Sequence, residues 1–304
     1  MEIKESAVPQ RGRTPAAKPR LDRRNREQPT SARLPSAEAC RTRLYESVVE
    51  EMELHIAQEE IEIHFAHMPM RYWPRVDDAS VRWHLQCAHE FLRHVVNDEA
   101  LSTSPVVRWR HFPDRGITEV LVCTWDRLGL LSKVAGAFAE VGLNIVRADI
   151  FTRADSVVMD IFQVSTEQFQ HVADEIRLEA MAKILDAALT AHRDLGLWGI
   201  RGDRGRQQAG DSALGLGGLP SININNQRTD ACTILEIEAR DRVGLLYLIF
   251  RVFTECEVDV AQAIITTEDG VAGDVFYLTD EDGLKITDAA RLTEIERRLV
   301  DVIC

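Results

Sequence analysis

The pattern of hydrophobic and polar positions in this chain occurs twice, with an offset of 115 residues. In residues 118–124, Val120 and Val122 point to one side and Glu119, Leu121 and Cys123 to the other, and residues 233–239 repeat this alternation more cleanly, with glutamates at 236 and 238. This period predicts a strand with one buried face in each copy. Apolar residues then recur at spacings of three and four over 131–141 and again over 246–256, which predicts an amphipathic helix. The register holds over about sixty positions, so we interpret the chain as an internal duplication.

Each copy continues with two β-rich segments and a second helix. These segments are 144–152, 156–164 and 167–191 in the first copy, and 259–267, 271–279 and 287–303 in the second. The predicted core order is therefore β-α-β-β-α in both copies.

A further apolar stretch precedes the first strand of each copy, at 105–109 and at 220–224. A strand that runs into the next one through a hairpin pairs with it antiparallel and can take the edge of the sheet. We therefore predict two four-stranded antiparallel sheets, each with two helices on one face and an edge strand supplied from upstream. The fold class is α+β.

Changes in composition divide the chain into five predicted parts. They are a disordered basic tail (1–35), a helical segment (36–103), the first β-α-β-β-α domain (104–192), a glycine-rich linker (193–219) and the second such domain (220–304). The tail lacks the apolar residues that would offset the entropy of ordering, and the linker holds eight of the 17 glycines. Ser36 can cap the first helix. We expect the helical segment to dock on the first domain, because its own apolar core is thin.

Charge and cysteine content narrow the class of protein. The formal net charge is −13, although the first 44 residues hold 11 Lys and Arg against 5 Asp and Glu, so the body is strongly acidic. An acidic body argues against nucleic acid as the main partner. The six cysteines are scattered without a Cys-x-x-Cys pair, which indicates reduced thiols and a cytoplasmic protein. No apolar run reaches the roughly 18–20 residues of a membrane span.

Histidines in the helical segment raise the question of a metal site. His64 and His67 are three residues apart, whereas His84, His89 and His94 are spaced by five and therefore wrap around a helix. We expect surface or partly packed histidines. No metal, no cofactor and no catalytic residue is predicted.

Two motifs stand out in the repeat. Asp126–Leu131 reads Asp-Arg-Leu-Gly-Leu-Leu and recurs, with one change, at 241–246, and Gly-Leu-Asn follows at 142–144. These motifs resemble the ACT domain, a small amino-acid-binding regulatory module with a ferredoxin-like fold. A narrower resemblance links 106–164 and 222–278 to the C-terminal tandem ACT region of the bifunctional uridylyltransferase/uridylyl-removing enzymes, which modify PII nitrogen-signalling proteins. Roughly residue 44 to the end is covered, including a segment ahead of the first ACT domain.

The resemblance implies a ligand site between the strand–helix turn and a neighbouring module. Amides at the helix N-terminus attract a carboxylate, while the side chains of Asp126 and Asn144 would receive an ammonium. The implied residues are Asp126, Arg127, Leu128, Gly129, Leu130, Leu131, Asn144 and Ile145 in the first copy, with Asp241, Arg242, Gly244, Leu245 and Asp259 as candidates in the second. Because Asp259 stands where the first copy has Asn144, we expect Asn144 to contribute more to binding. Structural roles remain open: Asp126 as an N-cap, Gly129 for close packing and Asn144 for the chain turn.

Three functions are compatible with these motifs. A catalytic or truncated uridylyltransferase is disfavoured, because residues 36–103 have no room for the nucleotidyltransferase and phosphohydrolase domains of the resembled enzyme. An interaction module would pair sheet edges, as a homodimer or with a separately encoded catalytic partner. The prediction that we favour is an amino-acid-binding regulatory protein of nitrogen metabolism, with glutamine as the ligand.

Overall fold

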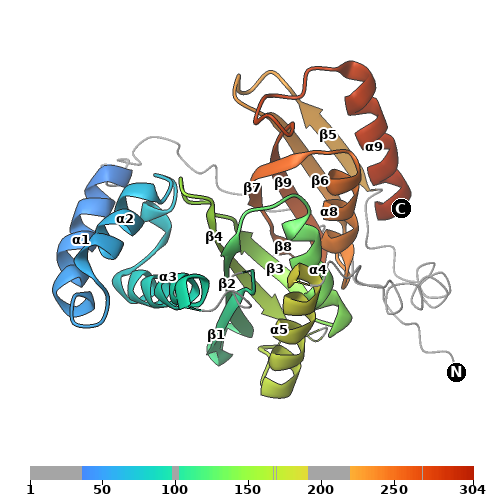
Figure 1. Cartoon of the computed structure of the whole chain (residues 1–304). Coiled ribbons are helices and arrows are strands. Elements are labelled where there is room, and N and C mark those ends of the chain that lie inside the picture. The colour runs from blue at the N-terminus through green and yellow to red at the C-terminus, as the bar shows by residue number, and fades with distance from the viewer. Residues whose placement is uncertain (1–35, 98–102, 167, 169, 191–219, 269) are drawn as a thin grey trace, which may run out of the picture. The chain divides into compact units, whose positions relative to one another are not determined.

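The structure, a computed structural model, describes residues 36–97, 103–166, 168, 170–190, 220–268 and 270–304, so the predicted tail (1–35) and linker (193–219) lie outside the described residues. Two α/β units follow a helical segment (Figure 1). We call the unit from β1 to α5 copy one and the unit from β5 to α9 copy two.

Copy one is a four-stranded antiparallel sheet in the order β1-β2-β4-β3. Its elements are β1 Val106–Phe112, η3 Pro113–Arg115, β2 Ile117–Trp125, α4 Leu130–Glu140, β3 Asn144–Asp149, β4 Val157–Ser165 and α5 Glu175–Thr190. Both helices pack on the same face of the sheet, because their apolar residues share one buried cluster with it.

Copy two repeats this topology in the order β5-β6-β9-β7. Its elements are β5 Ser221–Asn225, β6 Thr233–Arg240, α8 Leu245–Glu255, β7 Asp259–Ile264, β8 Thr267–Glu268, β9 Val271–Thr279 and α9 Ala289–Ile303. The short β8 pairs with β9, and the described part of copy one has no strand that corresponds to it.

The predicted upstream edge strands are confirmed. Val106 pairs with Cys123 in the antiparallel β1–β2 ladder, and Ile222 pairs with Ile237 in the β5–β6 ladder. The second helices, in contrast, begin later than predicted, at Glu175 instead of 167 and at Ala289 instead of 287. Aspartates set these starts: the side chain of Asp288 accepts hydrogen bonds from the amides of residues 290 and 291, and that of Asp174 accepts one from residue 176.

The helical segment consists of α1 Ala37–Met52, α2 Gln58–His67, η1 Trp73–Arg75 and α3 Asp78–Asn97. Ser36 caps α1 as predicted, since its hydroxyl accepts a hydrogen bond from the Ala39 amide at 3.2 Å. The segment packs on copy one: Trp73 and Phe91 share a buried cluster with Leu121 on the sheet face opposite α4 and α5.

Two of the histidines that we expected at the surface or partly packed are fully buried in the helical segment. His64 and His84 are almost fully enclosed, and the ring Nδ1 of His84 lies 2.7 Å from the Tyr72 hydroxyl. Burial lowers the pKa of His84 to about 3 and that of His64 well below its ordinary value. Both rings are therefore neutral packing groups at physiological pH.

The two copies share one hydrophobic core. Helix α4 packs against α8, strand β3 lies beside β7, and core residues from both sheets form a single cluster. In this arrangement the β2–α4 turn of copy one and the β6–α8 turn of copy two both face the interface between the copies.

Candidate functional site

The β2–α4 turn is built around a glycine. Helix α4 starts at Leu130 with Gly129 as its N-cap, and no side chain caps it, so the prediction of Asp126 as an N-cap is wrong. Gly129 has φ of +76°, and a Cβ atom there would lie 3.1 Å from Cγ2 of Thr254 on α8. The glycine therefore permits both the left-handed backbone and the close approach of copy two.

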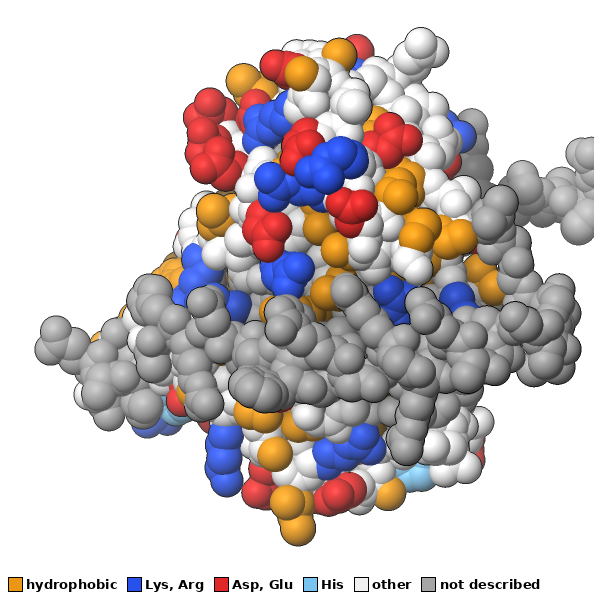
Figure 2. Space-filling view, turned by 90° about the vertical axis from the view of Figure 1, so that its right-hand side faces the viewer, with side chains coloured by type: hydrophobic (Ala, Val, Ile, Leu, Met, Phe, Trp, Pro, Cys, Tyr) orange, Lys and Arg blue, Asp and Glu red, His pale blue; other side chains and the backbone are white. Residues whose placement is uncertain are grey.

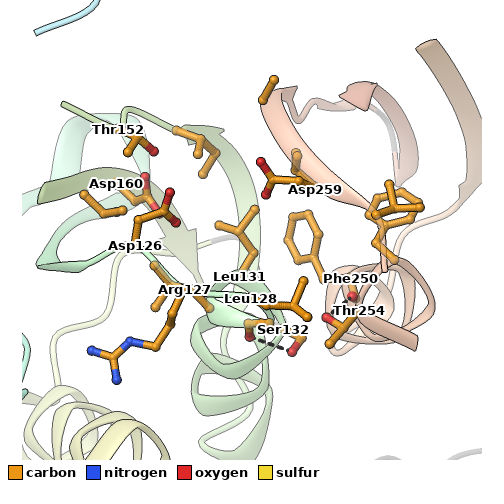
Figure 3. A pocket seen from close by; sticks show the side chains of 18 of the residues that line it. Asp126, Arg127, Leu128, Leu131, Ser132, Thr152, Asp160, Phe250, Thr254 and Asp259 are labelled. Atoms are coloured by element: carbon orange, nitrogen blue, oxygen red, sulfur yellow. Dashed lines mark hydrogen bonds between the residues drawn. The ribbon is translucent and has the colours of Figure 1, made fainter. Parts of the chain in front are cut away.

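A cavity of about 240 Å³ lies between this turn and copy two (Figure 3). Residues 126–132 form one wall, so all six predicted positions of the turn line it. Residues from α8 and from 258–261 at the start of β7 form the facing wall. Arg71 of the helical segment and further residues of copy one, among them Asp160 of β4, complete the lining.

Three aspartates surround the cavity. Figure 3 shows Asp126 and Asp160 together on the copy-one side and Asp259 opposite them on copy two. Burial raises the pKa of Asp126, and the negative charge of Asp259 raises it further. Burial also raises the pKa of Asp160 well above its ordinary value. The site is acidic and favours a ligand that donates hydrogen bonds or carries positive charge.

Arg71 connects three parts of the chain at this cavity. Its Nη2 donates hydrogen bonds to the carbonyl oxygens of Ile150 at 3.1 Å and Ala261 at 2.9 Å. The first carbonyl follows β3 of copy one and the second belongs to β7 of copy two, while Arg71 itself comes from the helical segment. Its guanidinium also lies over the Phe151 ring. Sequence reasoning missed this residue.

The arginine of each turn motif has a structural role. Arg127 Nη1 donates to the Leu189 carbonyl at the end of α5 at 3.1 Å, and Arg242 Nη2 donates to the Val302 carbonyl in the last turn of α9 at 2.7 Å. In Figure 3 the Arg127 guanidinium points away from the three carboxylates. Both arginines therefore fix the turn to the second helix of their own copy.

The structure does not bring Asn144 to Asp126. Asn144 Nδ2 instead donates a hydrogen bond to Oδ2 of Asp241, in the turn of copy two, at 2.5 Å. Asp259, the counterpart of Asn144, lines the cavity at the turn of copy one. Each copy thus places the start of its third strand at the turn of the other copy. Ile145 packs in the shared core rather than in the cavity.

The turn of copy two is closed by this hydrogen bond. Gly244 again has positive φ, at +83°, and Leu245 begins α8 and is buried. Burial raises the pKa of Asp241, although the hydrogen bond from Asn144 opposes this. Burial, together with the nearby charge of Asp241, raises the pKa of Asp274 to about 7, although a hydrogen bond from the Thr266 amide opposes the shift.

Asp160 and Asp274 are matching residues that the sequence reasoning did not assign to the site. Each lies on a central strand of its sheet with 1% exposure. A charged residue at the same position of an otherwise apolar strand in both copies was the available signal.

Other kinds of site find little support in the described residues. Within those ranges no three His, Cys, Asp or Glu side chains are arranged to hold a metal ion. The helices of the described part include none with the length and apolarity to cross a membrane. The face seen in Figure 2 carries interleaved acidic and basic side chains, and on α9 they are paired, as in Arg298 with Glu294 at 2.6 Å. The described residues visible on that face form no uniformly basic surface for nucleic acid.

Comparison with known proteins identifies both copies. The ACT domain family model matches residues 118–189, and a family model described as "ACR9-like, ACT-like domain" matches residues 221–304. A solved aspartate kinase from Synechocystis shares 16% identity and a TM-score of 0.35 over 62% of this chain and 27% of its own.

The chain is also similar to part of larger enzymes. It is 34% identical over 228 residues to the bifunctional uridylyltransferase/uridylyl-removing enzyme of Rhodospirillum rubrum, a match to 75% of this chain and 23% of that enzyme. The enzyme of the same name from Gluconobacter oxydans is 31% identical over 230 residues, again 75% of this chain and 23% of the relative. The chain therefore spans less than a quarter of the length of these curated relatives.

Proposed function

Because this chain carries two ACT domains in tandem, we propose that it is a regulatory protein that binds a free α-amino acid in the cavity between its two copies. The first candidate ligand is glutamine, and the regulated process is nitrogen metabolism. Both of these choices rest on the likeness to the uridylyltransferases.

The observation that supports the proposal is the placement of opposite kinds of group around one cavity. The Leu130 amide donates to the Arg127 carbonyl, but no side chain caps α4, and the N-terminal dipole of this helix favours a carboxylate. Asp126 and Asp259 face the same space and favour an ammonium. A zwitterionic amino acid carries both of these groups on one carbon.

Calorimetric titration of the full chain with each of the twenty amino acids tests the proposal. Asp126→Asn is expected to weaken binding by about 10- to 100-fold, since hydrogen bonds to charged groups contribute about 1.5–3 kcal/mol. Asp241→Asn is the matched control, because it changes the same motif at the turn that Asn144 closes. If no amino acid binds at millimolar concentration, or if the control loses binding equally, the proposal fails.

The geometry supports a ranking of Asn144 and Asp259 opposite to the one that we expected from the sequence. Asp259 lines the cavity, whereas Asn144 is hydrogen-bonded to Asp241. We therefore propose that Asp259→Ala weakens ligand binding more than Asn144→Ala.

A further inference from the structure

We infer that Asp160 selects the side chain of the ligand. The cavity takes an amino acid whose side chain ends in a hydrogen-bond donor, a carboxamide or an ammonium, and excludes one that ends in a carboxylate. This inference rests on the proposed function, because it assigns a role within the same cavity.

Asp160 offers an oxygen atom that lacks a partner. It is 1% exposed and lies in the middle of β4, paired with Val122 of β2. Its Oδ1 accepts a hydrogen bond from the Phe151 amide at 3.1 Å, whereas its Oδ2 has no hydrogen-bond partner among the described residues. Leaving a buried polar atom in this state has a free-energy cost. Because Asp160 lines the cavity, a donor on the ligand can relieve that cost.

The charges around Asp160 disfavour a second carboxylate. Asp126 approaches it from the turn, and Asp259 faces both from copy two. Arg71, from the helical segment, is the single cation that acts on Asp160 among the described residues; its Nη2 donates to two backbone carbonyl groups, while its buried Nε has no hydrogen-bond partner there. A ligand carboxylate here would therefore meet more negative than positive charge.

A neutral carboxyl group matches a carboxamide. Burial first, and then Asp126, raise the pKa of Asp160, while the Phe151 amide and Arg71 oppose the shift. The neutral group presents an O–H donor and an acceptor oxygen, and a carboxamide presents an acceptor oxygen and N–H donors. A ligand ammonium would pair with the ionised form instead. A ligand carboxylate has no donor for the unpartnered oxygen.

Titrations of the full chain with glutamine, lysine, glutamate and methionine test this selectivity without any variant. Methionine has a side chain of similar length but no donor. The tighter of glutamine and lysine is expected to bind at least about tenfold more tightly than glutamate and methionine. If glutamate or methionine binds within about threefold of it, the inference is overturned.

Asp160→Asn keeps the shape of the side chain and replaces a carboxyl group, which can ionise, by an amide, which cannot. The preference of the cavity for glutamine or lysine over glutamate is expected to shrink by about tenfold or more, and lysine is expected to bind more weakly than it does to the wild type. The matched control is Asp274→Asn, which alters the equivalent buried residue of copy two and should leave selectivity unchanged. An unchanged preference in Asp160→Asn, or an equal effect of the control, contradicts the inference. Thermal unfolding of both variants verifies that they fold.

The two proposals fail in distinguishable ways. If none of the twenty amino acids binds, the proposed function and the role of Asp160 both fall. If amino acids bind but glutamate is not discriminated against, the regulatory site stands and only the role of Asp160 is lost.

Discussion

The two strand–helix turns at the interface between the copies differ in the side chain that faces each of them from the other copy. At the turn of copy two, Asn144 donates a hydrogen bond to Asp241 and closes the contact. At the turn of copy one, Asp259 faces Asp126, and two carboxylates cannot donate to each other. The two copies share one fold, and an amide-to-acid difference leaves one of two equivalent positions without this hydrogen bond.

The outer faces of the two sheets differ as well. Copy one has Leu121 and Cys123 on the face that the helical segment covers. Copy two has Glu236 and Glu238 at the matching positions, of which Glu238 is exposed. The sheet of copy one is therefore buried on both faces, and that of copy two is covered on one.

The largest effect is expected when a residue of copy one is replaced by its counterpart in copy two. Leu121→Glu removes a fully buried apolar side chain and adds an unpaired charge, so we expect the free energy of unfolding to fall by about 5 kcal/mol. Denaturant unfolding measures this loss. The reverse change, Glu236→Leu, should have little effect, and similar losses in both variants would contradict the assignment of the faces.

The buried carboxyl group of Asp274 is expected to make the stability of copy two depend on pH. Its pKa of about 7 lies above the value of about 4 in the unfolded chain, so the folded state holds a proton that the unfolded state releases. The stabilisation is complete below about pH 4 and is lost as pH rises toward 7. Asp274→Asn should therefore gain stability relative to the wild type between pH 4.5 and 8, by up to about 4 kcal/mol.

Urea unfolding at about pH 4.5 and about pH 8 measures the difference in stability between Asp274→Asn and the wild type. Asp282→Asn, at an exposed position, serves as the control and should show no such trend. A difference between Asp274→Asn and the wild type that does not change with pH would refute the role of the buried carboxyl.

The contact between Asn144 and Asp241 can be isolated with a double-mutant cycle. Asn144→Ala is expected to lower the free energy of unfolding by about 1.5–3 kcal/mol, because a hydrogen bond to a charged group is lost. The corresponding cycle for Asp126 and Asp259 should give a coupling of opposite sign, since their charges repel. Couplings of the same sign in the two cycles would remove the proposed difference between the turns.

The smallest expected effect lies at the end of the first helix of each copy. Gly142 has φ of +68°, and its counterpart Glu257 adopts φ of +55° despite its side chain. Glu257→Gly should therefore raise the free energy of unfolding by about 1 kcal/mol. Gly142→Ala should lower it, because a Cβ atom there would lie 2.8 Å from Nη2 of Arg177. Thermal unfolding of both variants gives the signs, and a destabilised Glu257→Gly would show that backbone strain is absent.

The fold was largely predictable from the sequence because its determinants are local and occur twice. The repeated alternation of residues located the strands, and the shared offset of 105–109 and 220–224 located the edge strands. The turn motif located one wall of the cavity. Each of these inferences needs only the spacing of neighbouring residues.

The remainder of the site depends on packing between the copies. Asn144 was expected near Asp126, but α4 separates them with 11 residues. At 1.5 Å per residue, such a helix places the start of β3 about 16 Å from the turn. The partner of each turn comes from the other copy, and Arg71 comes from a third part of the chain. No spacing in one copy contains that information.

The upstream edge strand has a consequence for how the chain folds. Phe112 pairs with Ile117 across the short η3 turn, and Asn225 pairs with Ile234 across a longer loop. An edge strand placed after the second helix would have to close a loop of almost the whole domain, and both closure entropy and folding time grow with that separation. We therefore expect the β1–β2 hairpin to form within about 1–10 μs, before either helix docks, with the β5–β6 hairpin following.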